Sequence, residues 1–479
     1  MANYVFGANL IENLTTGMYQ NPLVIFREYI QNSCDAIDKA RADEILAADE
    51  GSIEITIDKD ARRITIEDNG TGIPVLDFKP TLTSIAASDK NLESNRGFRG
   101  IGRLCGVAYC KELRFTSTAK DEVVQSTMII NAENMCKKFY GKEKIKAEDL
   151  LDESINFPKV SVADPDEHFF RVELIDIVDT NNDLLDKEKV REYLSFVAPV
   201  DYKNSLGFKG LQNKILEHAA KLNFKIAGYK ILVDGEHLYK PYKSNFKTTH
   251  NGADEIFDID FRDFYDDEKN LIAWSWIGLS KFKGVIDQTS GTPDNLMRGI
   301  RLRAGNIQIG DQEALKHLFS EARGTNYFIG EVHAVDKNLI PNGRRDYFVE
   351  NKACNTFEGE LRKYFDELYK IYHAASDIRG FQKRISAPAE AVQDFQQGRS
   401  IFKNQAELNS ELAKLNKIAT TAENKIESVR KEAEQNPDSA LSRVVLRMTE
   451  NKIPPPVNMI RNKRKQKQNN FRPFIGAKI

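Results

Sequence analysis

Residues 21–40, NPLVIFREYIQNSCDAIDKA, carry three polar side chains whose chemistry and spacing could serve one site. Apolar residues recur through this stretch at helical spacing, and Pro22 suits the start of a helix. Glu28, Asn32 and Asp35 follow one another at steps of four and three, which at about 100° per residue puts them on one narrow strip. A carboxylate, an amide and a second carboxylate are therefore aimed at one place, although a solvated polar face would show the same spacing.

A second pattern, residues 52–74, ends in an acidic residue followed by spaced glycines. Its isoleucines alternate on both sides of a break at residues 58–61, which predicts two strands joined as a hairpin. Asp68, Gly70 and Gly72 follow the second strand in the order Asp-Asn-Gly-Thr-Gly. Such a sequence suits a buried hydrogen bond beside a close approach of the backbone, and an ordinary loop with two glycines is the alternative.

The third pattern is the glycine-rich stretch NRGFRGIGRL at residues 95–104. Gly97, Gly100 and Gly102 would let backbone N–H groups approach phosphate oxygens, and a following helix would point its positive end at them. The stretch is not a G-x-x-x-x-G-K-[ST] loop, and it does not follow a first strand–helix turn. The sequence therefore supports neither a P-loop nor a Rossmann site, and a glycine-rich hinge is the alternative.

The composition excludes several other classes of protein. A net charge of -2 over 479 residues argues against a polyanion binder, except through a local patch. The five cysteines form no C-x-x-C pair and no histidine lies in H-E-x-x-H, which disfavours a disulfide framework and a zinc hydrolase. No apolar run reaches the roughly 20 residues that cross a bilayer, and the N-terminal residues lack the features of a secretory signal. We therefore expect a cytoplasmic protein without membrane contact.

The patterns along the chain predict an α+β fold in three parts. Residues 1–185 mix helical and strand patterns, residues 186–375 form a second segment of α/β character, and residues 376–479 are helical with a basic tail. Residues 461–472 of this tail are rich in lysine and arginine. Such a run is usually a solvated tail, and contact with nucleic acid is the alternative.

The third part also contains a heptad pattern, because its apolar residues alternate steps of four and three. Two interpretations are open. The stretch is either an amphipathic helix packed on its own domain or a coiled coil that forms a dimer. The positions of this pattern are Leu408, Leu412, Leu415, Ala419, Ala422, Ile426, Val429 and Ala433.

The motifs E-x-x-x-N-x-x-D, D-x-G-x-G and G-x-x-G-x-G, in this order, resemble those of the GHKL ATPases, whose ATP-binding domain has the Bergerat fold. Within that superfamily, residues 9–40 are similar to the first two helices of the ninety-kilodalton heat-shock chaperones. TLTSIAASDK resembles the start of their lid, and GFRGIGRLCGVAYCKELRFTST resembles their glycine-rich segment with the strand after it. The resemblance implies a mixed sheet covered by helices, hydrolysis of ATP, and a magnesium ion.

The resemblance also implies a role for each matching residue. Glu28 would orient or activate the attacking water as a general base, and Asn32 would complete the shell of the magnesium ion. Asp68 would accept a hydrogen bond from the adenine amino group, with Asp35 in support. Residues 77–99 would form a lid that closes over ATP. The other residues implied to bind the nucleotide are Gly70, Gly72, Ile73, Ser88, Gly97, Phe98, Arg99, Gly100, Ile101 and Gly102.

Two positions depart from the family's pattern. A Gly-Thr pair usually precedes a late strand of this domain, with the threonine near the adenine, whereas HFFRVELIDI places Phe169 and Phe170 there. An asparagine just ahead of the lid is replaced by Thr81. Both departures concern the adenine end of the site rather than the phosphate chemistry.

The second segment resembles the middle domain of the same chaperones. Residues 298–311 resemble its central strand, and residues 333–348, HAVDKNLIPNGRRDYF, resemble the loop that sends an arginine to the γ-phosphate. The spacing from Asn342 puts Arg345 at that arginine, with Arg344 one step away. A cation there would neutralise charge that develops during phosphoryl transfer, and an exposed Arg-Arg-Asp loop is the alternative.

The resemblance extends over about residues 1–350, and the last part departs towards MORC-type ATPases, which belong to the same superfamily and act on DNA. Two classes of function remain open. The first is an ATP-driven, homodimeric chaperone-like clamp that acts on a protein client. The second is a MORC-like or antiviral defence-system ATPase that engages nucleic acid or a nuclease partner. A nucleotide sensor that binds ATP but barely hydrolyses it is a third class, which the intact Glu28 disfavours.

Overall fold

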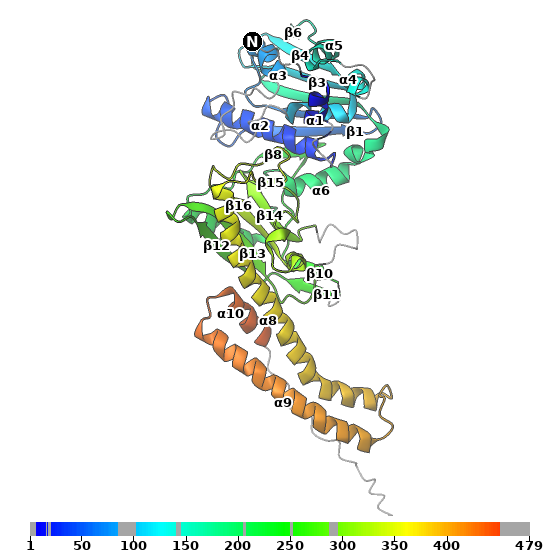
Figure 1. Cartoon of the computed structure of the whole chain (residues 1–479), viewed down its shortest axis with the longest axis vertical. Helices are drawn as coiled ribbons and strands as arrows, with labels where there is room; N and C mark the ends of the chain where they lie inside the picture. The colour runs from blue at the N-terminus through cyan, green and yellow to red at the C-terminus, as the bar shows by residue number, and fades with distance from the viewer. Residues whose placement is uncertain are drawn as a thin grey trace, which may run out of the picture. The chain divides into compact units, whose positions relative to one another are not determined.

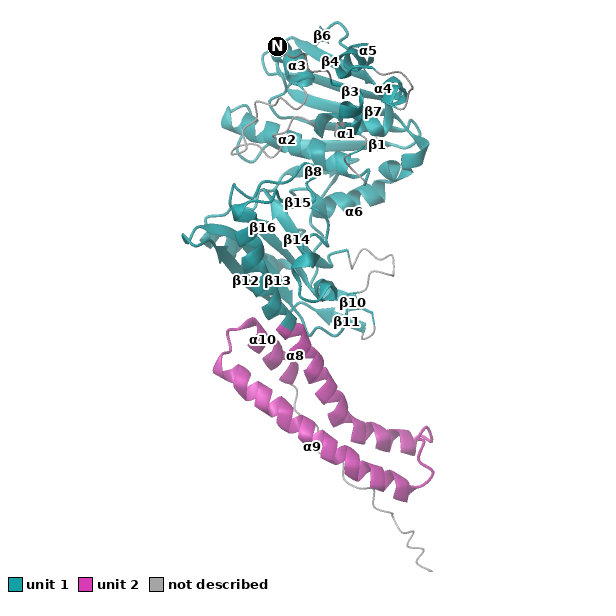
Figure 2. Ribbon diagram, viewed as in Figure 1, with its two compact units in different colours: residues 1–369 teal, residues 370–479 magenta. Residues whose placement is uncertain are grey.

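A computed structural model of the chain describes residues 6–15, 17, 21–84, 102–139, 145–204, 207–249, 252–286 and 296–450. The chain forms two compact units, residues 1–369 and residues 370–479 (Figure 2). The first unit combines sheets with helices and the described part of the second is helical, which confirms the predicted α+β fold class. The division into three parts at residues 185 and 375 remains a proposal.

Nine strands from the described residues form the first sheet, in the order β5-β4-β3-β7-β2-β1-β8-β9 with β6 beside β4 (Figure 1). Paired strands run antiparallel except β1 and β8, which run parallel. The sheet is therefore mixed, as the resemblance implies. Its strands are β1 (Ser52–Asp58), β2 (Arg63–Asp68), β3 (Cys110–Thr118), β4 (Val124–Asn131), β5 (Ile155–Asn156), β6 (Ser161–Val162), β7 (Phe169–Ile177), β8 (Lys230–Val233) and β9 (Glu236–His237).

The β1–β2 hairpin confirms the alternating pattern seen in the sequence. Ile55 and Ile66 are paired across the two strands and both are buried, whereas the residues beside them are more exposed. At the turn, the Asp58 carboxylate accepts the N–H of Ala61 at 2.9 Å, and Arg62 adopts a positive φ of 49°. The register of this hairpin places the acidic end of β2 inside the protein.

Helix α2 (Val24–Ala42) packs its apolar side chains on this sheet. Ile25, Phe26 and Ile30 are buried in the same core as the isoleucines of β1 and β2, and the helix contacts both strands. Because one face of α2 is fixed by this packing, the direction of its polar strip is fixed as well.

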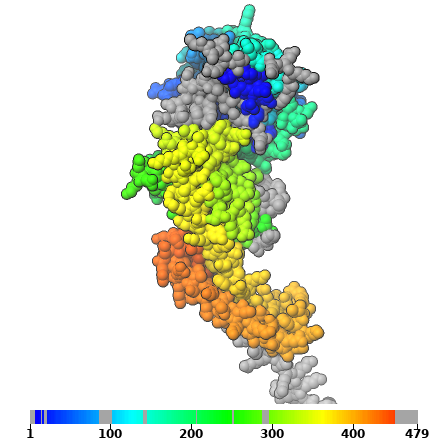
Figure 3. Space-filling view, viewed as in Figure 1, coloured from blue at the N-terminus to red at the C-terminus, as the bar shows by residue number. Residues whose placement is uncertain are grey.

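The other helices of the first unit are shorter than α2, apart from the start of a long helix that begins at Lys352. The space-filling view shows the dark-blue N-terminal segment at the surface (Figure 3), where Phe6 and Leu10 are exposed while Ile11 is buried. These helices are α1 (Asn9–Thr15), α3 (Val75–Thr83), α4 (Ala132–Phe139), α5 (Ala147–Ser154), α6 (Lys187–Val197) and α7 (Lys209–Lys221), with 3-10 helices η1 (Gly102–Ala108), η2 (Asp179–Leu185), η4 (Lys316–Leu318) and η5 (Ala322–Tyr327).

A second sheet of five strands has the order β12-β13-β16-β14-β15. Strand β14 lies one place from the edge of this sheet, whereas the resemblance implied a central strand for residues 298–311. Strands β14 and β16 are parallel, and the other pairs are antiparallel. The strands are β12 (Asp258–Tyr265), β13 (Leu271–Leu279), β14 (Gly299–Ala304), β15 (Ile307–Ile309) and β16 (Ile329–Ala334), and a separate hairpin contains β10 (Asn245–Thr248) and β11 (Gly252–Glu255).

A buried cluster of charged groups joins the second sheet to the residues before it. Glu331 on β16 is fully buried and pairs with Arg303 on β14 and with Lys240 at 3.3 Å. The hydroxyls of Tyr202 and Tyr242 donate to the same carboxylate at 2.6 and 3.1 Å. Burial alone would raise the pKa of Glu331, but Arg303 and Lys240 hold it well below its usual range. The cluster therefore centres on a charged carboxylate.

The first sheet is completed by residues from the second segment of the sequence. Strand β8 pairs in parallel with β1, with Lys230 opposite Ser52. The turn after β8 adds a further bond, because the Asp234 carboxylate accepts the N–H of Ile57 at 2.9 Å. The sheet that carries the predicted site thus includes strands that lie beyond residue 185.

The second unit contains the rest of α8 (Lys352–Gln396), together with α9 (Gln405–Gln435) and α10 (Ala440–Thr449). Within this unit, Ala422 and Ile426 of the predicted heptad pack against Phe381 and Ile385 of α8. This packing supports the interpretation of α9 as an amphipathic helix that packs on its own chain. The basic tail lies outside the described residues. Among those described, no helix is both long enough and apolar enough to cross a membrane.

Candidate active site

The three polar residues of the predicted strip are buried to different degrees on α2. Glu28 and Asp35 are 6% and 5% exposed, whereas Asn32 is half-buried. Burial of a carboxylate costs free energy unless the group is paired or hydrogen-bonded. The strip is therefore not a solvated polar face, and its two carboxylates depend on partners inside the protein.

Asp68 lies at the end of β2, against this helix. It is 1% exposed, and its Oδ1 accepts the N–H of Gly70 at 3.0 Å. A Cβ at residue 70 would lie 2.6 Å from the Cβ of Ala36 on α2, so the turn can approach the helix only with glycine there. The N–H of Thr71 also donates to the carbonyl of Ala36, at 3.3 Å. The structure thus fixes Asp68 and the turn after it against α2 at Ala36.

The second glycine of this motif is required by the conformation of the backbone. Gly72 has a φ of +63°, and a Cβ there would lie 1.9 Å from the carbonyl oxygen of Thr118. The next residue, Ile73, donates its N–H to the hydroxyl of Ser117 at 2.8 Å. That hydroxyl donates in turn to the carbonyl of Phe169, also at 2.8 Å. These contacts join the turn to β3 and β7.

The two phenylalanines that replace the expected Gly-Thr pair lie at the start of β7, next to Asp68. Phe170 is opposite Asp68 in the β2–β7 ladder, and its ring stacks on that of Phe115 with centroids 5.9 Å apart. His168 lies just before them, with its Nδ1 2.7 Å from the carbonyl oxygen of Gly70. The start of β7, with its aromatic side chains, therefore lies beside Asp68.

Gly102 brings the end of the glycine-rich stretch against Glu28. A Cβ at residue 102 would lie 2.7 Å from Oε2 of Glu28. The hydroxyl of Tyr29 accepts the N–H of Gly106 and donates to the carbonyl of Arg103, each at 3.1 Å. Burial raises the pKa of Tyr29 well above its usual range, so the phenol keeps the proton that it donates. Helix η1 is therefore anchored on α2 directly after Glu28.

Most of the predicted phosphate loop and lid lies outside the residues that the structure describes. Ser88, Gly97, Phe98, Arg99, Gly100 and Ile101 lie outside the described residues, and their roles stay predictions. Thr81 is within them and is exposed on α3, with its carbonyl accepting a hydrogen bond from Arg103.

Glu28 also contacts an arginine from the second segment. Nε of Arg345 lies 3.6 Å from Oε1 of Glu28, and Arg345 is 7% exposed. Its N–H donates to the carbonyl of Asn342 at 3.1 Å, and its φ is 55°, so a tight turn holds the residue. Arg344 is exposed, and its guanidinium makes no hydrogen bond or ion pair within the described part of the chain. The geometry favours Arg345 as the arginine that reaches Glu28.

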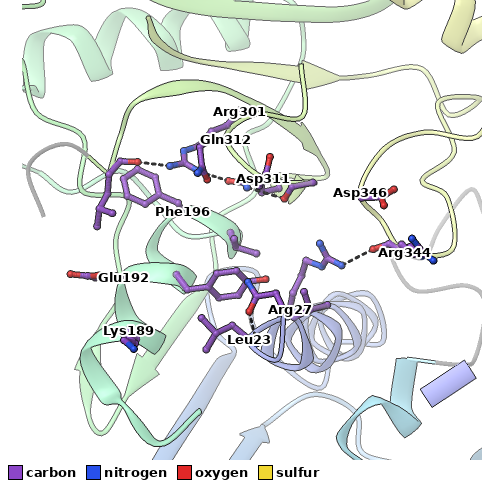
Figure 4. Close-up of a pocket in the computed structure, with 17 residues that line it drawn as sticks. Leu23, Arg27, Lys189, Glu192, Phe196, Arg301, Asp311, Gln312, Arg344 and Asp346 are labelled. Atoms are coloured by element: carbon purple, nitrogen blue, oxygen red, sulfur yellow. Dashed lines mark hydrogen bonds between the residues drawn. The ribbon is translucent and has the colours of Figure 1, made fainter. Parts of the chain in front are cut away.

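Arg27 connects both sides of this site, although the sequence patterns do not single it out. Its Nη2 lies 3.3 Å from Oε1 of Glu28 and donates to the carbonyl of Arg344 at 3.1 Å (Figure 4). Its Nη1 donates to the carbonyl of Arg345 at 3.5 Å. Residue 27 lies about 100° from Glu28 on the helix and so falls off the polar strip. Its place directly before Glu28 is the only sequence signal.

The two oxygens of Glu28 therefore have different surroundings. Oε1 is held by the guanidinium groups of Arg27 and Arg345. Oε2 lies towards Gly102 and makes no hydrogen bond or ion pair with any residue that the structure describes. One oxygen fixes the side chain, and the other can accept a proton from a water molecule bound at the glycine-rich end.

Residues 21–155 match the family described as histidine kinase-, DNA gyrase B-, and HSP90-like ATPase. Among curated proteins, the chain is similar to chaperone protein HtpG of Alkalilimnicola ehrlichii, at 40% identity over 85 residues that make up 16% of this chain and 13% of the relative. It is similar to chaperone protein HtpG of Bacillus subtilis at 38% identity over 85 residues, which make up 16% of this chain and 14% of that relative. The chain thus spans about one seventh of the length of these relatives. The matches confirm a GHKL-type ATPase domain that resembles the ninety-kilodalton chaperones in this region.

Proposed function

We propose that this chain, through the ATPase domain at residues 21–155, hydrolyses ATP with Glu28 as the general base. The observation that carries the proposal is the environment of Glu28. Arg27 and Arg345 hold its Oε1, while its Oε2 lies towards Gly102 at the end of the glycine-rich stretch. A buried carboxylate with one fixed and one available oxygen suits abstraction of a proton from an attacking water.

The two arginines have different places in this mechanism. Arg27 orients Glu28 through Oε1 and also holds the loop at residues 341–346 through two backbone carbonyls. Arg345 brings a second positive charge to the same oxygen. A guanidinium placed beside the base would stabilise negative charge that develops on the transferred phosphoryl group.

The described residues fit a nucleotide bound with magnesium. Asn32, half-buried one turn after Glu28, offers an amide oxygen of the kind that completes a magnesium shell otherwise made of phosphates and water. Asp68 is a buried carboxylate that can accept a hydrogen bond from the adenine amino group. A magnesium ion bound there would neutralise charge on the phosphates. Asn32, Asp35 and Asp68 would hold and orient the nucleotide around it.

We further propose that hydrolysis drives a homodimeric, chaperone-like clamp that acts on a protein client. Two observations support this extension. Residues 341–346 belong to the second segment yet contact Glu28 and Arg27. A conformational change at the nucleotide can therefore be transmitted to residues outside the ATPase domain. The exposed Phe6 and Leu10 offer apolar surface at the N-terminal end for a second copy.

The variant Glu28→Ala tests the central proposal. It should keep ATP binding, lose hydrolysis by roughly 10²- to 10⁴-fold, and accumulate the dimer in the presence of ATP. Nucleotide affinity, release of phosphate and molar mass are measured on the same preparation. The control Asp43→Ala removes an exposed carboxylate at the end of the same helix and should behave as the parent. Hydrolysis by Glu28→Ala at the parent rate would exclude Glu28 as the base.

The alternative function is a MORC-like or defence-system ATPase that engages nucleic acid or a nuclease partner. The lysine- and arginine-rich stretch at residues 461–472 is the observation that favours it. Salt-dependent binding of duplex DNA that disappears on deletion of residues 457–479 would support this alternative. Suppression of client aggregation by a chain that does not bind DNA would support the clamp.

A further inference from the structure

A pocket of about 720 Å³ opens within the first unit, beside Arg27. It is lined by the start of α2, by α6, by residues near β14 and β15, and by the loop that carries Arg344 (Figure 4). None of Glu28, Asn32, Asp35 and Asp68 lines it. Its size falls within the roughly 300–1,000 Å³ of pockets that hold small organic ligands.

One part of the pocket wall is apolar and belongs mainly to α6. Tyr193 and Phe196 come from this helix, and Val24 of α2 adds to the same lining. These side chains can cover the flat or aliphatic part of a ligand. The helix also contributes Glu192, whose carboxylate makes no hydrogen bond or ion pair within the described residues.

The rest of the wall carries both signs of charge, because the guanidinium groups of Arg27, Arg301 and Arg344 line it together with the carboxylates of Asp311 and Asp346. Arg301 is 4% exposed, lies over the ring of Phe196 at 4.1 Å and donates to the side-chain oxygen of Gln308 at 2.8 Å. In the described part of the chain, neither Arg301 nor Arg344 forms an ion pair with a carboxylate. Burial lowers the pKa of Arg301 to about 10, so this group stays protonated near neutral pH.

Two carboxylates of the same wall accept hydrogen bonds from neighbouring residues, whereas that of Glu192 on α6 has no such bond within the described residues. Asp311 accepts the N–H of Glu313 at 2.8 Å, and Asp346 accepts from the side chain of Asn342 at 2.6 Å. Both bonds lie within the loops that carry these residues. The pocket therefore combines an apolar lining with guanidinium groups that an anion can reach.

Arg27 links this pocket to the proposed catalytic base. It lines the pocket and its Nη2 is 3.3 Å from Oε1 of Glu28. Both groups also act on Tyr193 of the lining: burial raises its pKa to about 12, the charge of Arg27 lowers it and that of Glu28 adds to the rise. An anion in the pocket would share the positive charge of Arg27 with Glu28.

We propose that this pocket is a second, regulatory site for a small organic anion with an apolar part, and that its occupancy acts on Glu28 through Arg27. The anionic group binds near Arg27 and Arg344, and the apolar part lies against α6. A bound anion weakens the hold of Arg27 on Glu28 and on the carbonyls at residues 344 and 345. The regulatory half of this inference rests on the proposed hydrolysis at Glu28, whereas the binding half does not.

The binding half is tested on the full chain without nucleotide, with the aromatic sulfonate 8-anilinonaphthalene-1-sulfonate as the probe. We expect saturable binding at one site, at least tenfold tighter than that of N-phenyl-1-naphthylamine, which has the same rings without the anion. Glu192→Trp and Gln312→Trp fill the pocket from different elements and should each lower the affinity for the sulfonate at least tenfold. Glu188→Trp adds the same ring on an exposed position of α6 that does not line the pocket, and should leave the affinity unchanged. Equal binding by all three variants, or by the uncharged probe, would overturn the assignment.

The link to Glu28 is tested by the same titration, again without ATP. Glu28→Gln removes the charge that competes for Arg27 and should tighten binding of the sulfonate by about fivefold or more, since coupling between sites is reciprocal. The control Asp43→Asn removes one charge from the far end of α2 and should not change the affinity. An affinity in Glu28→Gln equal to that of the parent would overturn the coupling. Because no step depends on hydrolysis, failure here is distinct from failure of the proposed ATPase activity.

Discussion

The Asp68 carboxylate is almost fully buried, and its Oδ1 already accepts the N–H of Gly70. Replacing it with asparagine keeps the shape but turns part of an acceptor into a donor. We expect Asp68→Asn to weaken ATP binding by about 10- to 100-fold, the range for loss of a hydrogen bond to a charged group. Titration calorimetry measures this, with Glu67→Gln on the exposed side of the same strand as the control. Undiminished affinity in Asp68→Asn would remove the adenine role.

The contact of Arg345 with Glu28 predicts a defect in turnover rather than in binding. Arg345→Ala should slow ATP hydrolysis by roughly 10²-fold with ATP affinity intact, because the charge acts mainly in the transition state. Arg344→Ala removes the neighbouring exposed side chain and should have a smaller effect. Steady-state kinetics with an independent binding measurement separates the two parameters. An unchanged rate in Arg345→Ala would move the role to Arg344 or elsewhere.

Residues of the site differ in how far the sequence can predict them. Glu28, Asp35 and Asp68 follow from helical spacing and from a strand end, and all three are buried in the structure. Arg27 does not follow, because its importance comes from carbonyls more than 300 residues away. No local period encodes such a contact. Ser117 belongs to the same class, since its hydroxyl matters only once the strands are assembled.

Among the elements, the second sheet depends on one buried carboxylate. Glu331→Gln would leave Arg303 and Lys240 buried without their counter-charge. We expect this change to lower the free energy of unfolding by about 3–5 kcal/mol. Denaturant unfolding followed by tryptophan fluorescence suits this test, since Trp274 and Trp276, the only tryptophans, lie on β13 of this sheet.

The difference in the free energy of unfolding between the parent and Glu331→Gln depends on pH with a definite sign. The pKa of Glu331 is lowered in the folded protein, so its contribution is present above the unfolded pKa of about 4.3 and is lost as the pH falls through the folded value. The gap in stability between parent and Glu331→Gln should therefore narrow in acid. The control Glu313→Gln removes a partly exposed pair with Lys316 and should cost less than about 1 kcal/mol. Equal losses of unfolding free energy in Glu331→Gln and Glu313→Gln would contradict the structural role of the buried cluster around Glu331.

Elements with a strong local pattern are those that the sequence predicts best. The β1–β2 hairpin and α2 follow from periods of two and 3.6 residues, and both are present. The pairing of β8 with β1 joins residues about 180 positions apart and is not encoded by either period. The heptad pattern of α9 fits a coiled coil and a helix packed on its own chain equally well. The contacts with Phe381 and Ile385, which exist only in the folded unit, favour the packed helix.

For the whole molecule, the proposed clamp predicts a change of mass with nucleotide. A non-hydrolysable ATP analogue should shift the chain towards a dimer, and Glu28→Ala should show the same shift with ATP itself. Light scattering coupled to size-exclusion chromatography measures this shift. ADP serves as the control, because it lacks the γ-phosphate near which Glu28 is proposed to act. If the molar mass were the same with the analogue, with ADP and without nucleotide, the result would contradict an ATP-dependent clamp.

The parallel pairing of β8 with β1 has a consequence for how this protein can be altered by gene rearrangement. A recombination breakpoint near residue 185 would transfer the ATPase motifs without Lys230–Val233, and β1 would lose its neighbour. A bare strand of this kind offers its N–H and carbonyl groups to other chains and promotes aggregation. The ATPase region is therefore not an exchangeable module when cut at that point, and hybrids between relatives should survive only when residues 230–237 are inherited together with β1.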